Sequence, residues 1–278
     1  MSRIAERFRH CRAAGRAALI PYITAGDPAP EATLDLMRAA VAGGADILEL
    51  GVPFSDPSAD GPVIQAAALR ALEAGTTPAK VLDIVAAFRA EDTTTPVVLM
   101  GYANPMEAAG YAAFIADAAR AGVDGLLTVD LPLEEAEEAA AAARQYGIEL
   151  IYLVAPNTTP ERLRVVCAAA GGFVYAVALK GVTGAANLDV EQVREQVAAV
   201  RGATDLPVAV GFGVRDPASA ARLAPMADGV IVGSALVRLI GEHGAGPGLA
   251  DGLREAVSAL RKAMDSACSG SIETEEAS

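Results

Sequence analysis

Short apolar stretches alternate with longer helix-forming stretches eight times along this chain, and that alternation limits the fold more than any other feature. Each apolar stretch can be buried on both faces, as in a parallel sheet that helices cover. Eight such units in about 250 residues predict a (β/α)8 barrel, also called a TIM barrel. A doubly wound open sheet is the alternative. The predicted strands are 18–24, 46–50, 96–100, 125–129, 149–154, 173–177, 207–210 and 229–232.

The alternation continues to about residue 265 without a linker, so we predict one catalytic domain over residues 1–265. An extra arginine-rich amphipathic helix is expected before the first strand, at residues 2–14. Residues 266–278 are mostly small or acidic, and we predict a disordered tail there.

The composition excludes several classes of protein. No apolar run is long enough for a membrane span, and the N-terminus lacks the pattern of a secretion signal, so we expect a soluble cytoplasmic protein. A formal net charge of -13 opposes binding to nucleic acid or to an anionic membrane. The 3 cysteines and 2 histidines show no metal-ligand spacing, so we expect no metal site.

The second predicted strand carries an unexpected charge. Side chains alternate along a strand, so Ile47 and Glu49 share one face while Leu48 and Leu50 share the other. A buried carboxylate is costly unless it is paired or neutral. Glu49 is therefore a candidate acid–base residue with a raised pKa, and a buried structural ion pair is the alternative.

A proline-stiffened loop after this strand carries two more carboxylates. Asp60 stands directly before Gly61-Pro62, where a helix is expected to start. It is a second acid–base candidate, with a helix cap as the alternative. Asp56 is either a third candidate or an exposed turn residue.

For other residues at strand ends, two interpretations are open. Tyr22 and Tyr175 either reach into the barrel mouth or pack in the core. Asp130 is a site residue or, as we favour, a helix cap. Lys180 follows the sixth strand, where a Schiff-base lysine could stand, but its parity is opposite to that of Tyr175.

Three glycine-rich stretches follow the last three predicted strands. Glycines let backbone N–H groups approach a ligand, and a helix N-terminus adds partial positive charge. In barrels of this type the loops after strands seven and eight often bind phosphate. We therefore expect a phosphate site there, held by local dipoles because the global charge is negative; ordinary turn chemistry is the alternative. The stretches are 181–185, 211–214 and 233–235.

Two motifs in and after the second predicted strand are highly specific, Leu48-Glu49-Leu50-Gly51-Val52-Pro53-Phe54-Ser55-Asp56-Pro57 and Ala59-Asp60-Gly61-Pro62. Further motifs are residues 21–28, 181–184, Gly211-Phe212-Gly213, Gly233-Ser234 and Met100-Gly101-Tyr102-Ala103-Asn104-Pro105. In these motifs the chain resembles the tryptophan synthase alpha chain family, and the resemblance covers residues 2–265. The resemblance implies a lyase that cleaves indole-3-glycerol phosphate to indole and glyceraldehyde 3-phosphate by a retro-aldol reaction.

The resemblance also implies roles for individual residues. Glu49 would do the acid–base work, and Asp60 would accept a hydrogen bond from the indole N–H. Thr183 would lie on a loop that closes over the substrate. The residues expected to bind substrate are Tyr22, Met100, Tyr175, Thr183, Gly184, Phe212, Gly213, Gly233 and Ser234.

A partner is implied as well. The chain would pass indole to a tryptophan synthase beta chain in an alpha2beta2 heterotetramer, through a surface that includes Asp56 and the Asn104-Pro105 loop. Pyridoxal phosphate is expected only in the beta chain, and no cofactor is expected in this one. A stand-alone lyase that releases free indole, and a non-catalytic activator of a beta chain, are the alternatives.

Two departures from the family pattern stand out. Ala178-Leu179-Lys180 replaces an expected serine-rich segment, which could alter loop closure, and Tyr22 replaces a common phenylalanine.

Overall fold

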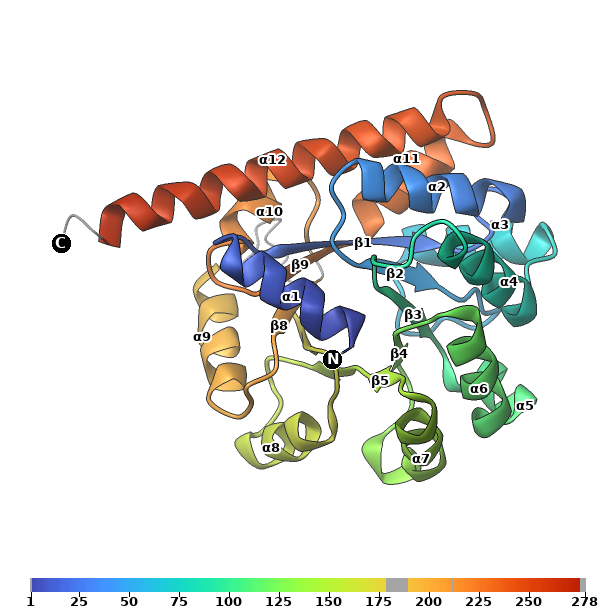
Figure 1. The fold of residues 1–278 in the computed structure, drawn as a ribbon, viewed down its shortest axis with the longest axis horizontal. Helices are drawn as coiled ribbons and strands as arrows, with labels where there is room; N and C mark the ends of the chain where they lie inside the picture. The colour runs from blue at the N-terminus through green and yellow to red at the C-terminus, as the bar shows by residue number, and fades with distance from the viewer. Residues whose placement is uncertain (1, 179–189, 212, 276–278) are drawn as a thin grey trace.

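A computed structural model describes residues 2–178, 190–211 and 213–275 of the chain. Its strands form one parallel sheet in the order β5-β4-β3-β2-β1-β9-β8-β7-β6. The two end strands, β5 (Glu149–Leu150) and β6 (Tyr152–Val154), are separated in sequence by Ile151 alone, so the sheet curls into a barrel (Figure 1). The predicted (β/α)8 barrel is thus confirmed, with its fifth strand divided in two.

The other strands agree with the predicted ones to within two residues at each end. They are β1 (Ala18–Thr24), β2 (Leu48–Gly51), β3 (Val97–Gly101), β4 (Gly125–Thr128), β7 (Val174–Val177), β8 (Val208–Gly211) and β9 (Gly229–Val232). The helices among the described residues are α1 (Arg3–Ala13), α2 (Pro30–Ala42), α3 (Pro62–Glu73), α4 (Pro78–Arg89), α5 (Ala103–Ala109), α6 (Tyr111–Ala121), η1 (Leu133–Glu135), α7 (Glu137–Tyr146), α8 (Pro160–Ala169), α9 (Val190–Arg201), α10 (Pro217–Leu223), α11 (Ser234–His243) and α12 (Leu249–Glu275).

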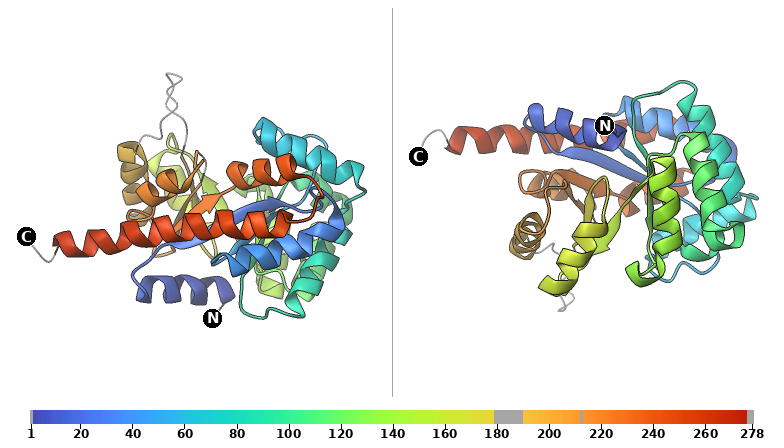
Figure 2. Two further views of the ribbon diagram at one scale, coloured as in Figure 1. Left: turned by 90° about the horizontal axis from the view of Figure 1, so that it is seen from above. Right: turned by 60° about the horizontal axis from the view of Figure 1, so that its bottom comes forward.

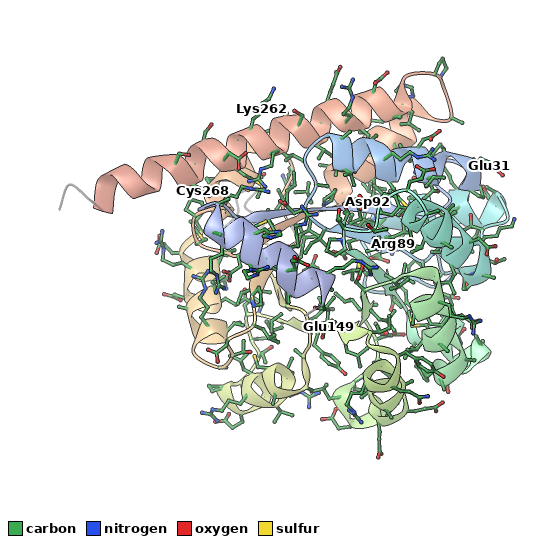
Figure 3. All side chains as sticks on the ribbon, in the orientation of Figure 1. Glu31, Arg89, Asp92, Glu149, Lys262 and Cys268 are labelled. Carbon is green, nitrogen blue, oxygen red and sulfur yellow. The ribbon has the colours of Figure 1, made fainter. Side chains whose placement is uncertain are left out.

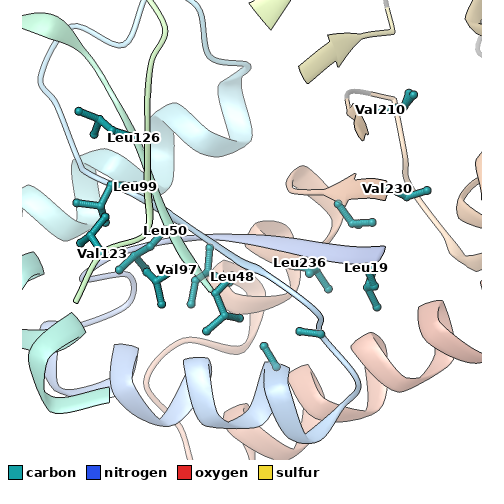
Figure 4. Packing of buried hydrophobic residues seen from close by; sticks show 14 of the residues in the cluster. Leu19, Leu48, Leu50, Val97, Leu99, Val123, Leu126, Val210, Val230 and Leu236 are labelled. Atoms are coloured by element: carbon teal, nitrogen blue, oxygen red, sulfur yellow. The ribbon is translucent and has the colours of Figure 1, made fainter. Parts of the chain in front are cut away.

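The strands separate two hydrophobic clusters. Leu48 and Leu50 belong to the outer cluster, between the sheet and the helices, where Figure 4 shows them with other residues of that layer. Ile47 belongs to the inner cluster, inside the barrel. The alternation predicted for this strand is confirmed, and it directs Glu49 to the interior.

The expected N-terminal helix, α1, closes the amino end of the barrel. Its Phe8 ring lies 5.6 Å from the ring of Phe173. Ile4 and Phe8 also approach Gly125 and Gly229, the first residues of β4 and β9. These apolar side chains seal the end of the barrel where the strands begin.

Three aspartates at the amino end share one arrangement. Asp46, Asp124 and Asp228 each precede a strand and each accept a hydrogen bond from a backbone N–H of the neighbouring strand. Each also pairs with one arginine from α1 and at least one from another segment. The pairs are Arg7, Arg16 and Arg261 with Asp46, Arg3 and Arg89 with Asp124, and Arg12 and Arg201 with Asp228. The arginines of α1 therefore fasten this helix to the barrel.

Arg89 shows how a helix end joins these pairs. It is the last residue of α4, and its guanidinium donates to the backbone oxygen of Asp92 at 2.8 Å as well as to Asp124. Figure 3 labels Arg89 and Asp92 close to each other.

Some element boundaries differ from the predicted ones. The helix expected over 107–121 is two helices, because Gly110 adopts a φ of 81° between α5 and α6. The last helix was expected to end near residue 265, but α12 continues to Glu275. Figure 2 shows this helix extending past the barrel. The disordered tail over residues 266–278 stays a prediction. The division of the chain at residue 265 stays a prediction. Among the described helices, none combines the length and the apolar character that a membrane span requires.

Candidate active site

A cavity of about 390 Å³ lies at the carboxyl end of the barrel strands. Its walls come from strand ends and from the loops after β2, β8 and β9. This is the end of a (β/α)8 barrel where active sites are built. The lining residues are Tyr22, Glu49, Asp60, Gly61, Pro62, Val63, Ile64, Met100, Tyr175, Gly213, Val214, Arg215, Ile231, Gly233, Ser234 and Arg238.

Glu49 is a buried carboxylate at this cavity. It lies on β2, opposite Tyr22 of β1 and Val98 of β3. Its side chain is 1% exposed, and neither carboxylate oxygen has a hydrogen-bond partner within the described part of the chain. Burial, and then the nearby charge of Asp60, raise the pKa of Glu49 to about 8. The alternative of a buried ion pair finds no basic partner among the described residues.

Asp60 lies directly before α3 but does not cap it. The N-cap position belongs to Gly61, and no side chain accepts a hydrogen bond there. Instead the Tyr102 hydroxyl donates to Oδ2 of Asp60 at 3.0 Å. Burial raises the pKa of Asp60, while this hydrogen bond favours the ionised form and lowers it. Asp60 is therefore aimed at the cavity by a side chain from the end of β3.

Tyr102 is a site residue that sequence reasoning missed. Its hydroxyl also accepts from the Ala59 N–H at 3.0 Å, and its ring lies 5.4 Å from the ring of Phe54. Burial and the charge of Asp60 raise its pKa, so the hydroxyl keeps its proton and stays a donor. The motif around Met100 contained the signal, but a tyrosine just past a strand end is usually taken for packing.

Two glycines make room for two tyrosines in the barrel mouth. A Cβ at Gly51 would stand 2.1 Å from the Tyr22 hydroxyl, and a Cβ at Gly211 would stand 2.1 Å from the Tyr175 hydroxyl. Both tyrosines are buried, and burial raises the pKa of each. The hydroxyl that distinguishes Tyr22 from a phenylalanine fits because Gly51 has no side chain.

The predicted phosphate end adjoins the same cavity. Gly213 has a φ of 78°, which favours glycine, and Gly233 precedes Ser234, the first residue of α11. The first N–H groups of a helix have no acceptor within the helix and can bind an anion. Arg215 and Arg238 also line this end, and sequence reasoning did not single them out.

The residues predicted to meet a partner lie outside the cavity lining. Asp56 is exposed in the loop before α3. Asn104 and Pro105 lie in the first turn of α5, so the prediction of a loop there is wrong. Asp130 accepts a hydrogen bond from the Ala103 N–H at 2.7 Å and so caps α5 rather than the helix that follows it in sequence.

Several predicted residues lie outside the described part of the chain. They are Thr183, Gly184, Phe212, Leu179 and Lys180. The substrate-binding and Schiff-base predictions that concern them stay predictions. Within the described residues, no group of three or more His, Cys, Asp or Glu side chains could hold a metal ion.

Comparison with known proteins identifies one family. Its model, described as "Tryptophan synthase alpha chain", matches residues 8–267. The tryptophan synthase alpha chain of Halorhodospira halophila is 70% identical over 97% of this chain and 99% of its own length. That of Thioalkalivibrio sulfidiphilus is 58% identical over 95% of this chain and 100% of its own.

Solved structures agree with this result. Tryptophan synthase subunit alpha from Legionella pneumophila superposes with a TM-score of 0.88 at 42% identity, covering 96% of this chain and 99% of that one. A chain of tryptophan synthase from M. tuberculosis, in an aminoacrylate-bound form, gives 0.85 at 40% identity over 95% of this chain and 100% of that one. The chain therefore belongs to the tryptophan synthase alpha chain family and is an indole-3-glycerol-phosphate lyase.

Proposed function

We propose that Glu49 and Asp60 carry out the acid–base chemistry by which this chain cleaves indole-3-glycerol phosphate to indole and glyceraldehyde 3-phosphate. The observation that supports this most is the buried carboxylate of Glu49, which has no hydrogen-bond partner among the described residues and lines a cavity of about 390 Å³. A pKa of about 8 lets one carboxyl group both give and take a proton near neutral pH.

The reaction needs two proton movements. One proton goes to C3 of the indole ring, and one leaves the hydroxyl on the glycerol carbon attached to C3. The bond between these carbons then breaks, its electron pair returns to the ring, and the hydroxyl carbon becomes an aldehyde. Because one proton is gained and one is lost, no external acid or base is consumed. Glu49 is the group we assign to these transfers.

Asp60 has a different task in this proposal. Protonation at C3 leaves positive charge on the indole nitrogen, and an ionised carboxylate that accepts from its N–H stabilises that charge. Tyr102 holds one oxygen of Asp60 and leaves the other available. Tyr22, Met100 and Tyr175 supply the walls of the indole site.

The phosphate of the substrate would bind at the glycine-rich residues that line the same cavity. Gly213, Gly233 and Ser234 offer backbone N–H groups to the phosphate, as do Gly184 and Phe212 in the family expectation. Closure by Thr183 belongs to the same expectation. Anchoring the phosphate fixes the distance of the reacting carbon from Glu49.

An alpha chain of this family implies a beta chain as partner. We assign Asp56, Asn104 and Pro105 to the contact surface and propose an alpha2beta2 heterotetramer to which indole is passed. Pyridoxal phosphate would belong to the beta chain, and this chain would need no cofactor. A cytoplasmic location stays a prediction.

Indole release from indole-3-glycerol phosphate tests the assignment. Glu49→Gln should abolish turnover, and Asp60→Asn should remove most of it. Glu149→Gln, which changes the glutamate on β5 away from the cavity, is the matched control and should stay active. Near-normal turnover by Glu49→Gln at unchanged circular dichroism would refute the role of Glu49.

The same assay with and without a beta chain tests the partner. We expect the beta chain to raise the rate of indole formation. Fast turnover that a beta chain leaves unchanged would favour the stand-alone lyase, and no cleavage under either condition would favour the non-catalytic activator.

A further inference from the structure

Two arginines at the phosphate end of the cavity have no acidic partner among the described residues. Arg215 and Arg238 are both exposed residues, and both are among the residues that line the same cavity as Glu49. Of the chain's arginines, most form ion pairs, such as those of α1 with the aspartates at the amino end. Among the side chains that the structure describes, the guanidinium groups of Arg215 and Arg238 have neither an ion pair nor a hydrogen bond. Their charge is therefore available to a ligand.

They come from two different segments, each next to residues of the expected phosphate site. Arg238 lies one helical turn after Ser234 in α11, so both side chains project from the same face of the helix. Arg215 lies two residues after Gly213, in the loop that leads to α10. The loop after β8 and the helix after β9 thus each contribute a backbone anion site and one guanidinium.

The nearest carboxylate in sequence is already occupied. Asp216, next to Arg215, accepts from the backbone N–H of Ser219 in a capping box at the start of α10. This hydrogen bonding lowers the pKa of Asp216 and directs its charge to the helix N-terminus. It therefore does not compete for a ligand that Arg215 would meet in the cavity.

The net charge of the chain explains why arginines would be needed at a phosphate site. With a formal net charge of -13, it repels a phosphate ester at long range. Backbone dipoles act only over the first turn of a helix, whereas a guanidinium carries a full charge and forms two parallel bonds with a phosphate.

We propose that Arg215 and Arg238 bind the phosphate of the substrate directly and determine its affinity, alongside the backbone N–H groups. This inference rests on the proposed function of the cavity. It names two binding residues for the phosphate ester and assigns them no proton transfer, so kcat should depend on them much less than KM.

Steady-state kinetics with Arg215→Gln, Arg238→Gln and the double variant test it. Each single change should raise KM for indole-3-glycerol phosphate roughly three- to tenfold, and the double change more, with kcat within about twofold. Arg222→Gln removes the same charge from α10 outside the cavity lining and should leave KM unchanged.

Binding measurements separate phosphate recognition from damage to the cavity. Titration with glycerol 3-phosphate and with inorganic phosphate should show weaker binding to both variants, whereas titration with indole should not. The increase of KM with ionic strength should be smaller in the double variant. Unchanged KM and phosphate affinity in an active double variant would overturn the inference, as would equal losses for indole and phosphate. Failure of the wild-type chain to cleave the substrate would instead overturn the proposed function.

Discussion

The two ends of the barrel treat buried carboxylates in opposite ways. At the amino end, Asp46 is 1% exposed and is held by Arg16 at 2.7 Å, by Arg261 at 3.2 Å and by the backbone N–H of Leu19. At the carboxyl end, Glu49 is equally buried and has no such partner among the described residues. Only two residues separate them in the chain. Asp60 is intermediate, with one hydrogen bond from Tyr102.

This difference separates the carboxylates that stabilise the fold from those that take part in catalysis. A buried charge with several partners stabilises the ionised form and joins the elements that supply those partners. A buried carboxyl without partners prefers to be neutral, which destabilises the folded state at high pH but provides a proton near neutrality. Burial alone does not separate the two kinds, whereas the number of partners does.

Removing the charge at the amino end should have the largest effect on stability. Asp46→Asn leaves Arg16 without its carboxylate and Arg261 with Asp265 alone, and breaking such a buried pair costs about 3–5 kcal/mol. Urea unfolding followed by circular dichroism measures the loss. Asp56→Asn, in the exposed loop, is the control. A loss below about 1 kcal/mol would show that the two ends do not differ in the way described.

Removing the carboxyl group of Glu49 should change the stability in the opposite direction, and the size of the change should depend on pH. Between the ordinary carboxyl pKa and about 8, folded Glu49 keeps its proton while the unfolded chain releases it, so raising the pH favours unfolding. Glu49→Gln removes this dependence. The stability of the variant relative to wild type should rise by about 4 kcal/mol between pH 4.5 and pH 8 and stay level above it.

Unfolding free energies of both proteins across this pH range check the prediction. The difference between the two curves is the informative quantity, because a buried glutamine amide adds its own constant cost. Parallel curves would mean that Glu49 titrates normally and that its environment is not what makes it an acid–base group.

Asp60, which has one hydrogen-bond partner, allows a further test of this comparison. Tyr102→Phe keeps the ring next to Phe54 but removes the hydroxyl that favours ionised Asp60. The pKa of Asp60 should rise, so the acid limb of the kcat/KM profile should move to higher pH, and kcat should fall about tenfold. Tyr111→Phe, at a buried tyrosine outside the cavity lining, is the control. An unmoved acid limb would leave Tyr102 with a packing role alone.

The comparison also shows what could be predicted from the sequence. Strand parity placed Glu49 inside the barrel and Leu48 outside, because alternation in a buried strand is local. The partners of a carboxylate, in contrast, can come from distant parts of the sequence. Asp46 meets Arg261 across 215 residues, and Asp60 meets Tyr102 across 42. For this reason the sequence left a helix cap open as the alternative for Asp60, whereas in the structure its carboxylate accepts from Tyr102 and does not cap α3.

The separate roles of two neighbouring glycines could not be predicted from the sequence for a similar reason. The sequence showed Gly211 and Gly213 as members of one phosphate-binding stretch, but they meet different needs. Gly213 has a positive φ, whereas Gly211 leaves space for the Tyr175 hydroxyl. That space depends on a side chain from β7, which periodicity cannot reveal.

The smallest effect should come from the outermost partner at the amino end. Arg7 lies 3.9 Å from Asp46, farther than Arg16 or Arg261, and its side chain is 24% exposed. Because Asp46 keeps its two nearer partners, Arg7→Gln should cost less than about 1 kcal/mol. Urea unfolding against Arg16→Gln, which removes a pair of hydrogen bonds to the same carboxylate, measures the contrast. Equal losses from the two variants would mean that the carboxylate responds to the total positive charge around it rather than to bonded partners. The number of partners would then no longer distinguish Asp46 from Glu49.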